Sequence, residues 1–67
     1  SKYPIGCKVI YRNAGRKGDG NIAEVYSYLH RHTDPDRVTY IELRFGPITN
    51  HVVTVNQLSK YYNKISA

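Results

Sequence analysis

Two histidines carry the spacing in this chain that comes nearest to a metal site. His30 and His32 would lie on the same face of a strand, and a neutral imidazole is a good ligand for zinc. A structural zinc site needs four ligands, and Cys7 and His51 are the other His and Cys residues of the chain. Because nothing in the sequence brings these two beside the histidine pair, we predict no metal site and no cofactor.

The spacing Gly15-x-x-Gly18-x-Gly20 is superficially that of a phosphate-binding loop. Such a loop connects a strand to the N-terminus of a helix, whereas strand-forming residues follow this one. We therefore exclude a nucleotide-binding loop. Arg16 and Lys17 within it remain candidates for contacts with phosphate groups.

Catalysis would need a nucleophile, a base and an orienting acid. Cys7, His51 and Asp19 supply these residue types, but no local pattern links them. Cys7 opens a strand-like segment, where a small buried residue is the simpler interpretation. The sequence therefore predicts a protein that is not an enzyme.

Tyrosine is the unusual residue of the composition, with 7 among 67 residues. Segment 22–30 predicts a strand whose two faces separate with a period of two. Its inward face would carry small and aliphatic side chains, namely Ala23, Val25, Ser27 and Leu29. Its outward face would carry polar and aromatic side chains, namely Glu24, Tyr26, Tyr28 and His30.

Segment 38–45 predicts an antiparallel partner for this strand. The favoured register has two pairs inside, Val25 with Leu43 and Ser27 with Ile41. Outside it has an aromatic pair and a pair of opposite charges, Tyr28 with Tyr40 and Glu24 with Arg44. Such cross-strand pairs stabilise a ladder, and a slip of one residue would bury tyrosine and arginine. The sequence thus predicts a stripe of exposed rings on the sheet.

The charge balance favours acidic partners. Lysine and arginine number 10 against 5 acidic residues, which gives a net charge of +5 and a pI near 9.6. Exposed rings stack on bases, at ~1–3 kcal/mol per base, and cations neutralise phosphates. We therefore predict RNA or DNA as the leading partner, bound by Lys8, Arg12, Arg16, Lys17, Tyr26, Tyr28, His30, Tyr40 and Arg44.

Other interpretations of the aromatic residues remain open. Tyrosine pairs well across a ladder, so the rings could simply cover the sheet or dock on a neighbouring domain. We expect no membrane partner, because the sequence has neither an amphipathic helix nor an apolar run of about 20 residues. The oligomeric state stays open.

Turn residues bound the remaining elements. We expect strands at 7–12 and from 49 or 51 to 55, and a short fifth strand at 60–65. Residues 13–21 predict a mobile, basic hairpin loop, and residues 56–59 a single 3₁₀ turn that drops Leu58 into the core. Four or five short strands in so small a chain predict an all-β fold that forms a closed or nearly closed barrel.

Three stretches resemble Tudor-type and chromo-barrel domains: Gly6-x-x-Val9-x-Tyr11 with Ala23-x-Val25, Tyr40-Ile41-x-Leu43-x-Phe45-Gly46, and Val53-x-Val55-x-x-Leu58. The resemblance implies a five-stranded SH3-like barrel, strongly bent, with a 3₁₀ turn before the last strand. It also implies a non-enzymatic module of chromatin- or RNA-associated proteins, and hence an intracellular, nuclear location. Residues 1–67 would be one such domain, cut from a longer protein, and the lone cysteine fits a reducing compartment.

The chain departs from this family where methylated side chains are held. Gly20 and Asn21 stand in place of aromatic residues, and Arg44 stands where an acidic residue is usual. A guanidinium at the rim opposes the binding of a cation between ring faces. The alternative that the resemblance implies is a module that recognises a protein or peptide in a rim pocket near Tyr11 and Phe45. A methyl-lysine or methyl-arginine reader requires that these two rings and another tyrosine rebuild the cage.

Overall fold

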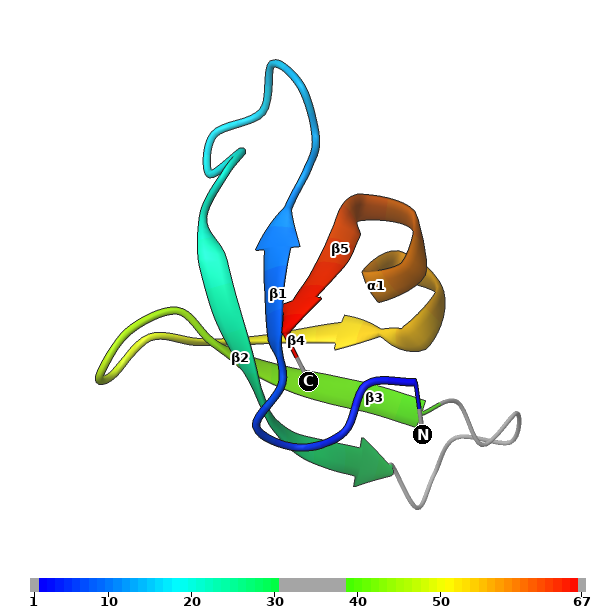
Figure 1. Ribbon diagram of the computed structural model, residues 1–67. Helices are drawn as coiled ribbons and strands as arrows, with labels where there is room; N and C mark the ends of the chain where they lie inside the picture. The colour runs from blue at the N-terminus through cyan, green and yellow to red at the C-terminus, as the bar shows by residue number, and fades with distance from the viewer. Residues whose placement is uncertain (1, 31–38, 67) are drawn as a thin grey trace.

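The computed structural model describes residues 2–30 and 39–66, with the backbone alone at His30. Its elements follow the chain as β1 (Lys8–Tyr11), β2 (Ile22–His30), β3 (Thr39–Arg44), β4 (Asn50–Thr54), α1 (Val55–Tyr61) and β5 (Tyr62–Ser66). The strands form one antiparallel five-stranded sheet in the order β4-β3-β2-β1-β5 (Figure 1). The prediction of a small, mostly β protein with five strands is confirmed. Between the described residues no ladder joins β4 to β5, so the sheet is not closed.

The long strand β2 connects two parts of the sheet that run in different directions. Its first residues pair with β1, from Ile22 to Glu24, and its remainder pairs with β3. In Figure 1, β3 and β4 cross the direction of β1 and β5, and β2 bends between them. One face of the sheet is thereby folded around the core.

A β-bulge at Tyr26 produces this bend and corrects the predicted register. Glu24 pairs with Arg44 and Val25 with Leu43, as predicted. Beyond the bulge the register shifts, so that Ser27 pairs with Glu42 and Tyr28 with Ile41. Tyr26 is the extra residue of β2, and an extra residue bends a strand and reverses the alternation that follows it.

The reversal overturns the predicted orientation of half of β2. Tyr28 lies on the core side and packs against the buried cluster, while Leu29 is 40% exposed and pairs with Tyr40. The prediction of an unbroken outward stripe of tyrosines is therefore wrong at Tyr28. Tyr26 does face outward, at 41% exposure.

Hydrogen bonds explain why the bulge is favoured. The Ser27 hydroxyl donates to Glu42 Oε1 at 2.8 Å, and the Tyr28 hydroxyl donates to the carbonyl oxygen of Tyr3. In the predicted register Ser27 would face Ile41 inside, where its hydroxyl would lose this partner. A buried polar group without a partner costs about 1–3 kcal/mol, and the bulge avoids this loss while moving an aromatic ring onto the core.

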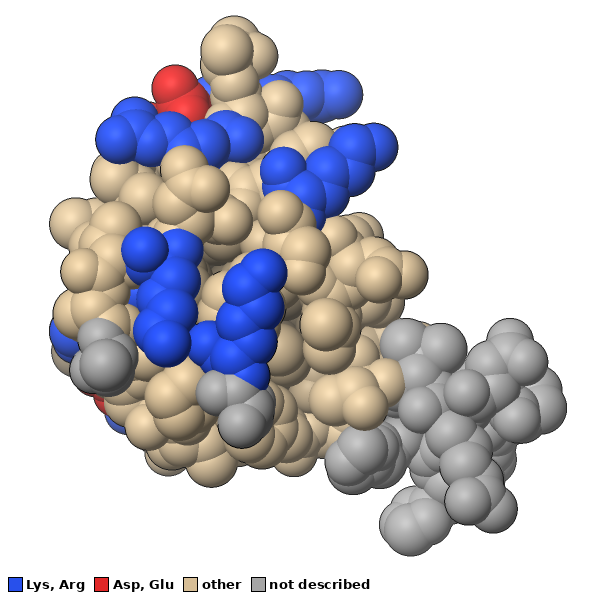
Figure 2. Space-filling view, turned by 45° about the vertical axis from the view of Figure 1, so that its right-hand side comes forward, with Lys and Arg blue, Asp and Glu red and all other residues tan. Residues whose placement is uncertain are grey.

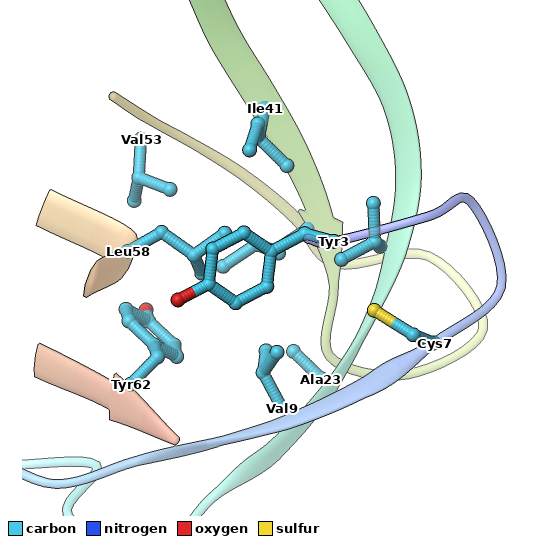
Figure 3. Close-up of a cluster of buried hydrophobic side chains, with 10 residues drawn as sticks. Tyr3, Cys7, Val9, Ala23, Ile41, Val53, Leu58 and Tyr62 are labelled. Carbon is cyan, nitrogen blue, oxygen red and sulfur yellow. The ribbon is translucent and has the colours of Figure 1, made fainter. Parts of the chain in front are cut away.

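The core draws on every element and on the N-terminal segment. Figure 3 shows the ring of Tyr3 among side chains from β1, β3, β4 and α1. The buried hydrophobic residues are Tyr3, Cys7, Val9, Ala23, Val25, Ile41, Leu43, Val53, Leu58 and Tyr62. The predicted burial of Cys7 and Leu58 is confirmed, since both are 0% exposed.

An α-helix replaces the predicted 3₁₀ turn before the last strand. Thr54 and Gln57 form a capping box: Gln57 N donates to Thr54 Oγ1 at 3.1 Å, and Thr54 N donates to Gln57 Oε1 at 2.9 Å. These bonds satisfy backbone groups at the start of a helix and extend a single turn to the seven residues of α1. The helix of the described residues is far too short to span a membrane. It ends at Tyr61, so Tyr61 and Tyr62 belong to different elements.

Candidate functional site

An aromatic hollow of about 510 Å³ lies where loop 12–21, the β3–β4 turn and the end of α1 meet. The rings of Tyr11, Phe45 and Tyr61 line it, and the buried side chains of Val53 and Tyr62 form its floor. We call this site the aromatic hollow. Tyr11 comes from β1, Phe45 from the β3–β4 turn and Tyr61 from α1, so the hollow depends on the whole fold.

Tyr11 is the most closely held of these rings. Its hydroxyl accepts a hydrogen bond from Asn13 Nδ2 at 3.0 Å, and its ring centroid lies 5.0 Å from that of Tyr62 and 6.5 Å from that of Tyr61. Gly18 passes close to the same ring at a φ of 95°, where a β-carbon would lie 3.8 Å from Tyr11 Cδ2. Burial, and to a lesser degree the neighbouring Tyr11, raise the pKa of the Tyr62 phenol.

Loop 12–21 is folded into successive turns. Arg16 N donates to Asn13 O at 3.0 Å, and Asp19 N donates to Arg16 O at 3.2 Å. The Asp19 carboxylate accepts from Asn13 N at 2.9 Å, so it stabilises the backbone of its own loop. This loop therefore presents Arg16 and Lys17 on a backbone that its own hydrogen bonds hold in turns.

The electrostatics of the aromatic hollow favour an anion. Lys17 lines it, and no carboxylate does so among the described residues. The neighbouring Arg12 is exposed, and its backbone N–H donates to Tyr61 O at 2.6 Å, which fixes this arginine beside the wall of the hollow. His51 meets the ring of Phe45 edge-on, with centroids 6.4 Å apart.

A second hollow of about 330 Å³ lies beside the first and shares Phe45 with it. Lys8 and Arg44 line this second hollow with Glu24 between them. Lys8 Nζ lies 2.8 Å from Glu24 Oε1, and this hydrogen bond lowers the pKa of the Glu24 carboxyl. The charge of Arg44, the cross-strand partner of Glu24, lowers the same pKa to a smaller degree, and its guanidinium lies 3.7 Å from the ring centre of Tyr26.

Of the residues predicted to bind nucleic acid, the structure exposes the cations of β1 and loop 12–21 but does not gather the tyrosines on one face. The cations Lys8, Arg12, Arg16 and Lys17 are all exposed, and Val9, which follows Lys8 in β1, is buried. Figure 2 shows lysine and arginine side chains spread from one end of the molecule to the middle of one face, with few acidic atoms among them.

The predicted aromatic stripe does not form a continuous stacking face. The Arg44 guanidinium covers Tyr26, Tyr28 packs on the core, and Tyr40 is half-buried opposite Leu29. The side chain of His30 lies outside the described residues. The two rings proposed for the rim pocket, Tyr11 and Phe45, both line the aromatic hollow.

Sequence reasoning missed the third ring, Tyr61, and the amides of Asn21 and Gln57 that border the hollow. The signal for Tyr61 was present in Thr54-x-x-Gln57, a capping-box pattern that starts a helix. Extending that helix to residue 61 separates Tyr61 from Tyr62 and turns it toward Tyr11.

No group of three or more metal-ligating side chains occurs within the described ranges 2–30 and 39–66. His32 of the predicted histidine pair lies outside them. Cys7 is buried, and burial raises the pKa of its thiol, although the nearby Lys64 acts in the opposite direction.

No family model matches this chain, and no curated protein or solved structure matches it either. Its function is therefore argued from the geometry of the two hollows and the charge around them.

Proposed function

We propose that this chain is a non-enzymatic binding module that holds single-stranded nucleic acid at the aromatic hollow. The rings of three tyrosines and of Phe45 line the hollow, and the charged side chain that lines it among the described residues is the cation Lys17. Aromatic rings stack on unpaired bases at ~1–3 kcal/mol per base, and nearby cations hold the backbone. This pairing of rings with a cation is the observation that carries the proposal.

The proposed architecture is an SH3-like barrel of the Tudor or chromo-barrel type. Two features support it: β5 returns to pair with β1 at the far side of β2, and α1 connects β4 to β5. The bent sheet packs one face around a single buried cluster. In this arrangement residues of the hairpin loop, the β3–β4 turn and the end of α1 line the aromatic hollow.

A second candidate is a peptide that carries a methylated lysine or arginine. The observation in its favour is that Tyr61 joins Tyr11 and Phe45, which supplies the third ring that a cage requires. Cation–π attraction is worth about 0.5–2 kcal/mol, but Lys17 at the same hollow repels a cationic ligand. The charge therefore favours the nucleic acid.

The proposal is tested by titrating fluorescein-labelled oligouridylate and oligodeoxythymidylate at several salt concentrations. Binding should weaken steeply with salt, because each neutralised phosphate contributes about −0.7 to the slope of log K against log salt concentration for a single strand. The two oligomers separate RNA from DNA preference.

Lys17→Gln should reduce the magnitude of that slope by about 0.7, since it removes one phosphate contact. Lys2→Gln is the matched control, because it removes the same charge from the N-terminal segment, at the opposite end of the molecule from loop 12–21 (Figure 1). Affinity that is indifferent to salt contradicts the proposal. Binding of a methylated peptide with shifts at Tyr11, Phe45 and Tyr61, and no oligomer binding, replaces it with the second candidate.

A further inference from the structure

Phe45 stands between the two hollows and lines both of them. The start of β2 runs along the same path, since Asn21 borders the aromatic hollow and Ile22 to Glu24 border the second. An extended ligand that leaves the aromatic hollow can therefore pass Phe45 and enter the second hollow without leaving the protein surface.

Arg44 in the second hollow is prepared to bind an anion. Its guanidinium stacks on Tyr26 at 3.7 Å, and its Nε donates to Asn50 Oδ1 at 3.3 Å. Between the described residues it has no ion pair with a carboxylate, because Glu24 is bound to Lys8. The remaining N–H groups of a planar guanidinium form a fork that fits two phosphate oxygens.

We propose that the two hollows are successive subsites for one nucleic acid strand. The aromatic hollow takes an unpaired base, and Arg44 binds the phosphate of the next nucleotide along the strand. Phe45 separates the two subsites. This inference rests on the proposed function. It adds that a ligand must be longer than one nucleotide to fill both subsites, because a mononucleotide reaches the first subsite alone.

The charge balance of the second hollow supports this assignment. Lys8 and Glu24 neutralise each other at 2.8 Å, so the net charge that the hollow offers to a ligand is that of Arg44. Among the described residues, each hollow has one lysine or arginine outside an ion pair, Lys17 in the first and Arg44 in the second, which matches a ligand with one phosphate per subsite. A methylated cation would meet like charge in both.

The test compares the binding of uridine 5′-monophosphate with that of a uridine tetranucleotide. The same comparison is made with thymidine 5′-monophosphate and a thymidine tetranucleotide. The ¹H–¹⁵N spectrum of the full chain reports binding and confirms that each variant is folded. We expect the tetranucleotide to bind more tightly than the mononucleotide, with shifts at Arg44 and Lys8 that the mononucleotide does not cause. Shifts at Tyr11 and Tyr61 should be common to both.

Arg44→Gln should weaken tetranucleotide binding about tenfold, as expected for a charged hydrogen-bonded contact, and leave mononucleotide binding unchanged. Lys17→Gln should weaken both ligands to a similar degree. Arg44→Lys keeps the charge but loses the fork and the stacking, so the salt slope should be retained while the affinity falls.

Two outcomes overturn the inference and they are distinguishable from each other. If the tetranucleotide binds but Arg44→Gln affects both ligands equally, or affinity does not rise with length, the two-subsite assignment fails and the proposed function stands. If neither ligand binds, or a methylated peptide binds in their place, the proposed function fails with it.

Discussion

At the scale of single residues, the hydroxyl of Tyr28 decides which way the second half of β2 faces. It donates to the carbonyl oxygen of Tyr3, which ties the N-terminal segment to the sheet. Tyr26, two residues earlier in β2, faces outward under the guanidinium of Arg44. Two tyrosines separated by one residue therefore have different structural roles.

Tyr28→Phe should lower the free energy of unfolding by about 1 kcal/mol, because it leaves a partly buried carbonyl without its donor. Tyr26→Phe is the matched control and should leave stability nearly unchanged. Urea denaturation of both variants measures the difference. Equal losses of stability in the two variants would contradict the inward position of the Tyr28 side chain.

The Cys7 thiol should make stability depend on alkaline pH. Burial raises its pKa above that of an exposed thiol in the unfolded chain, despite the opposing effect of Lys64. The unfolded state therefore loses its proton first as the pH rises. The stability contribution is complete below the unfolded pKa and is lost as the pH rises through the folded pKa.

We expect the free energy of unfolding to fall as the pH rises above the ordinary thiol pKa of about 8.5 and toward the raised pKa of the folded protein. Cys7→Ala should be less stable at pH 7, because it opens a cavity, but should lose less stability over this range. The raised pKa of Tyr62 leaves some alkaline loss in both proteins. Parallel pH profiles would contradict the role of Cys7.

At the scale of elements, the capping box decides whether the segment after β4 is a turn or a helix. Thr54 ends β4 with its backbone and starts α1 with its side chain. Because the last residue of α1 is Tyr61, the same hydroxyl indirectly positions one ring of the aromatic hollow.

Thr54→Ala should cost about 1 kcal/mol of stability, as is typical for the loss of an N-cap side chain. It should also weaken oligonucleotide binding, because the helix end that carries Tyr61 becomes less ordered. Thr54→Ser keeps the hydroxyl and should preserve both properties. Thermal unfolding together with the titration described above measures the two effects, and an unchanged affinity would separate the cap from the hollow.

The sequence predicts the elements better than it predicts their faces. The bounds of β2 and the burial of Val25 follow from period-two patterning and agree with the structure. The bulge could not be predicted this way, because it depends on Glu42 and Tyr3, which are distant in sequence and contribute partners only after folding. Alternation within one strand contains no information about those partners.

For the aromatic hollow, too, one part could be predicted from the sequence and another was missed. Tyr11 and Phe45 were placed together by resemblance to known barrels, and the structure puts both in one hollow. The sequence pattern places Tyr61 in the expected strand at 60–65, because the four residues 56–59 are too short for a stable helix. Its position depends on local capping chemistry that the sequence does contain.

At the scale of the whole molecule, a small hydrophobic core supports the aromatic hollow. A chain of 67 residues has a total stability of only about 3–10 kcal/mol, at 0.05–0.15 kcal/mol per residue. Leu58 is fully buried and is the buried residue of α1, so it connects the helix to the sheet. The site and the core therefore share this helix.

Leu58→Ala should cost about 2–5 kcal/mol, through the lost burial and the cavity left behind. This is a large fraction of the total, so the variant should be substantially unfolded near 37 °C. Leu58→Met fills a similar volume and should cost less than about 1.5 kcal/mol. Circular dichroism during thermal unfolding measures both, and a mild effect of Leu58→Ala would show that α1 is not needed for the core.

The bulge in β2 also offers a practical position for a reporter. Tyr26 has no backbone partner in the β2–β3 ladder and is 41% exposed, so a larger indole at this position can extend toward solvent while its ring stays beneath Arg44. The chain contains no tryptophan, and Tyr26→Trp would give it a single intrinsic fluorophore directly beneath the Arg44 guanidinium. Emission from that position would report the arrival of a ligand at the second hollow in real time.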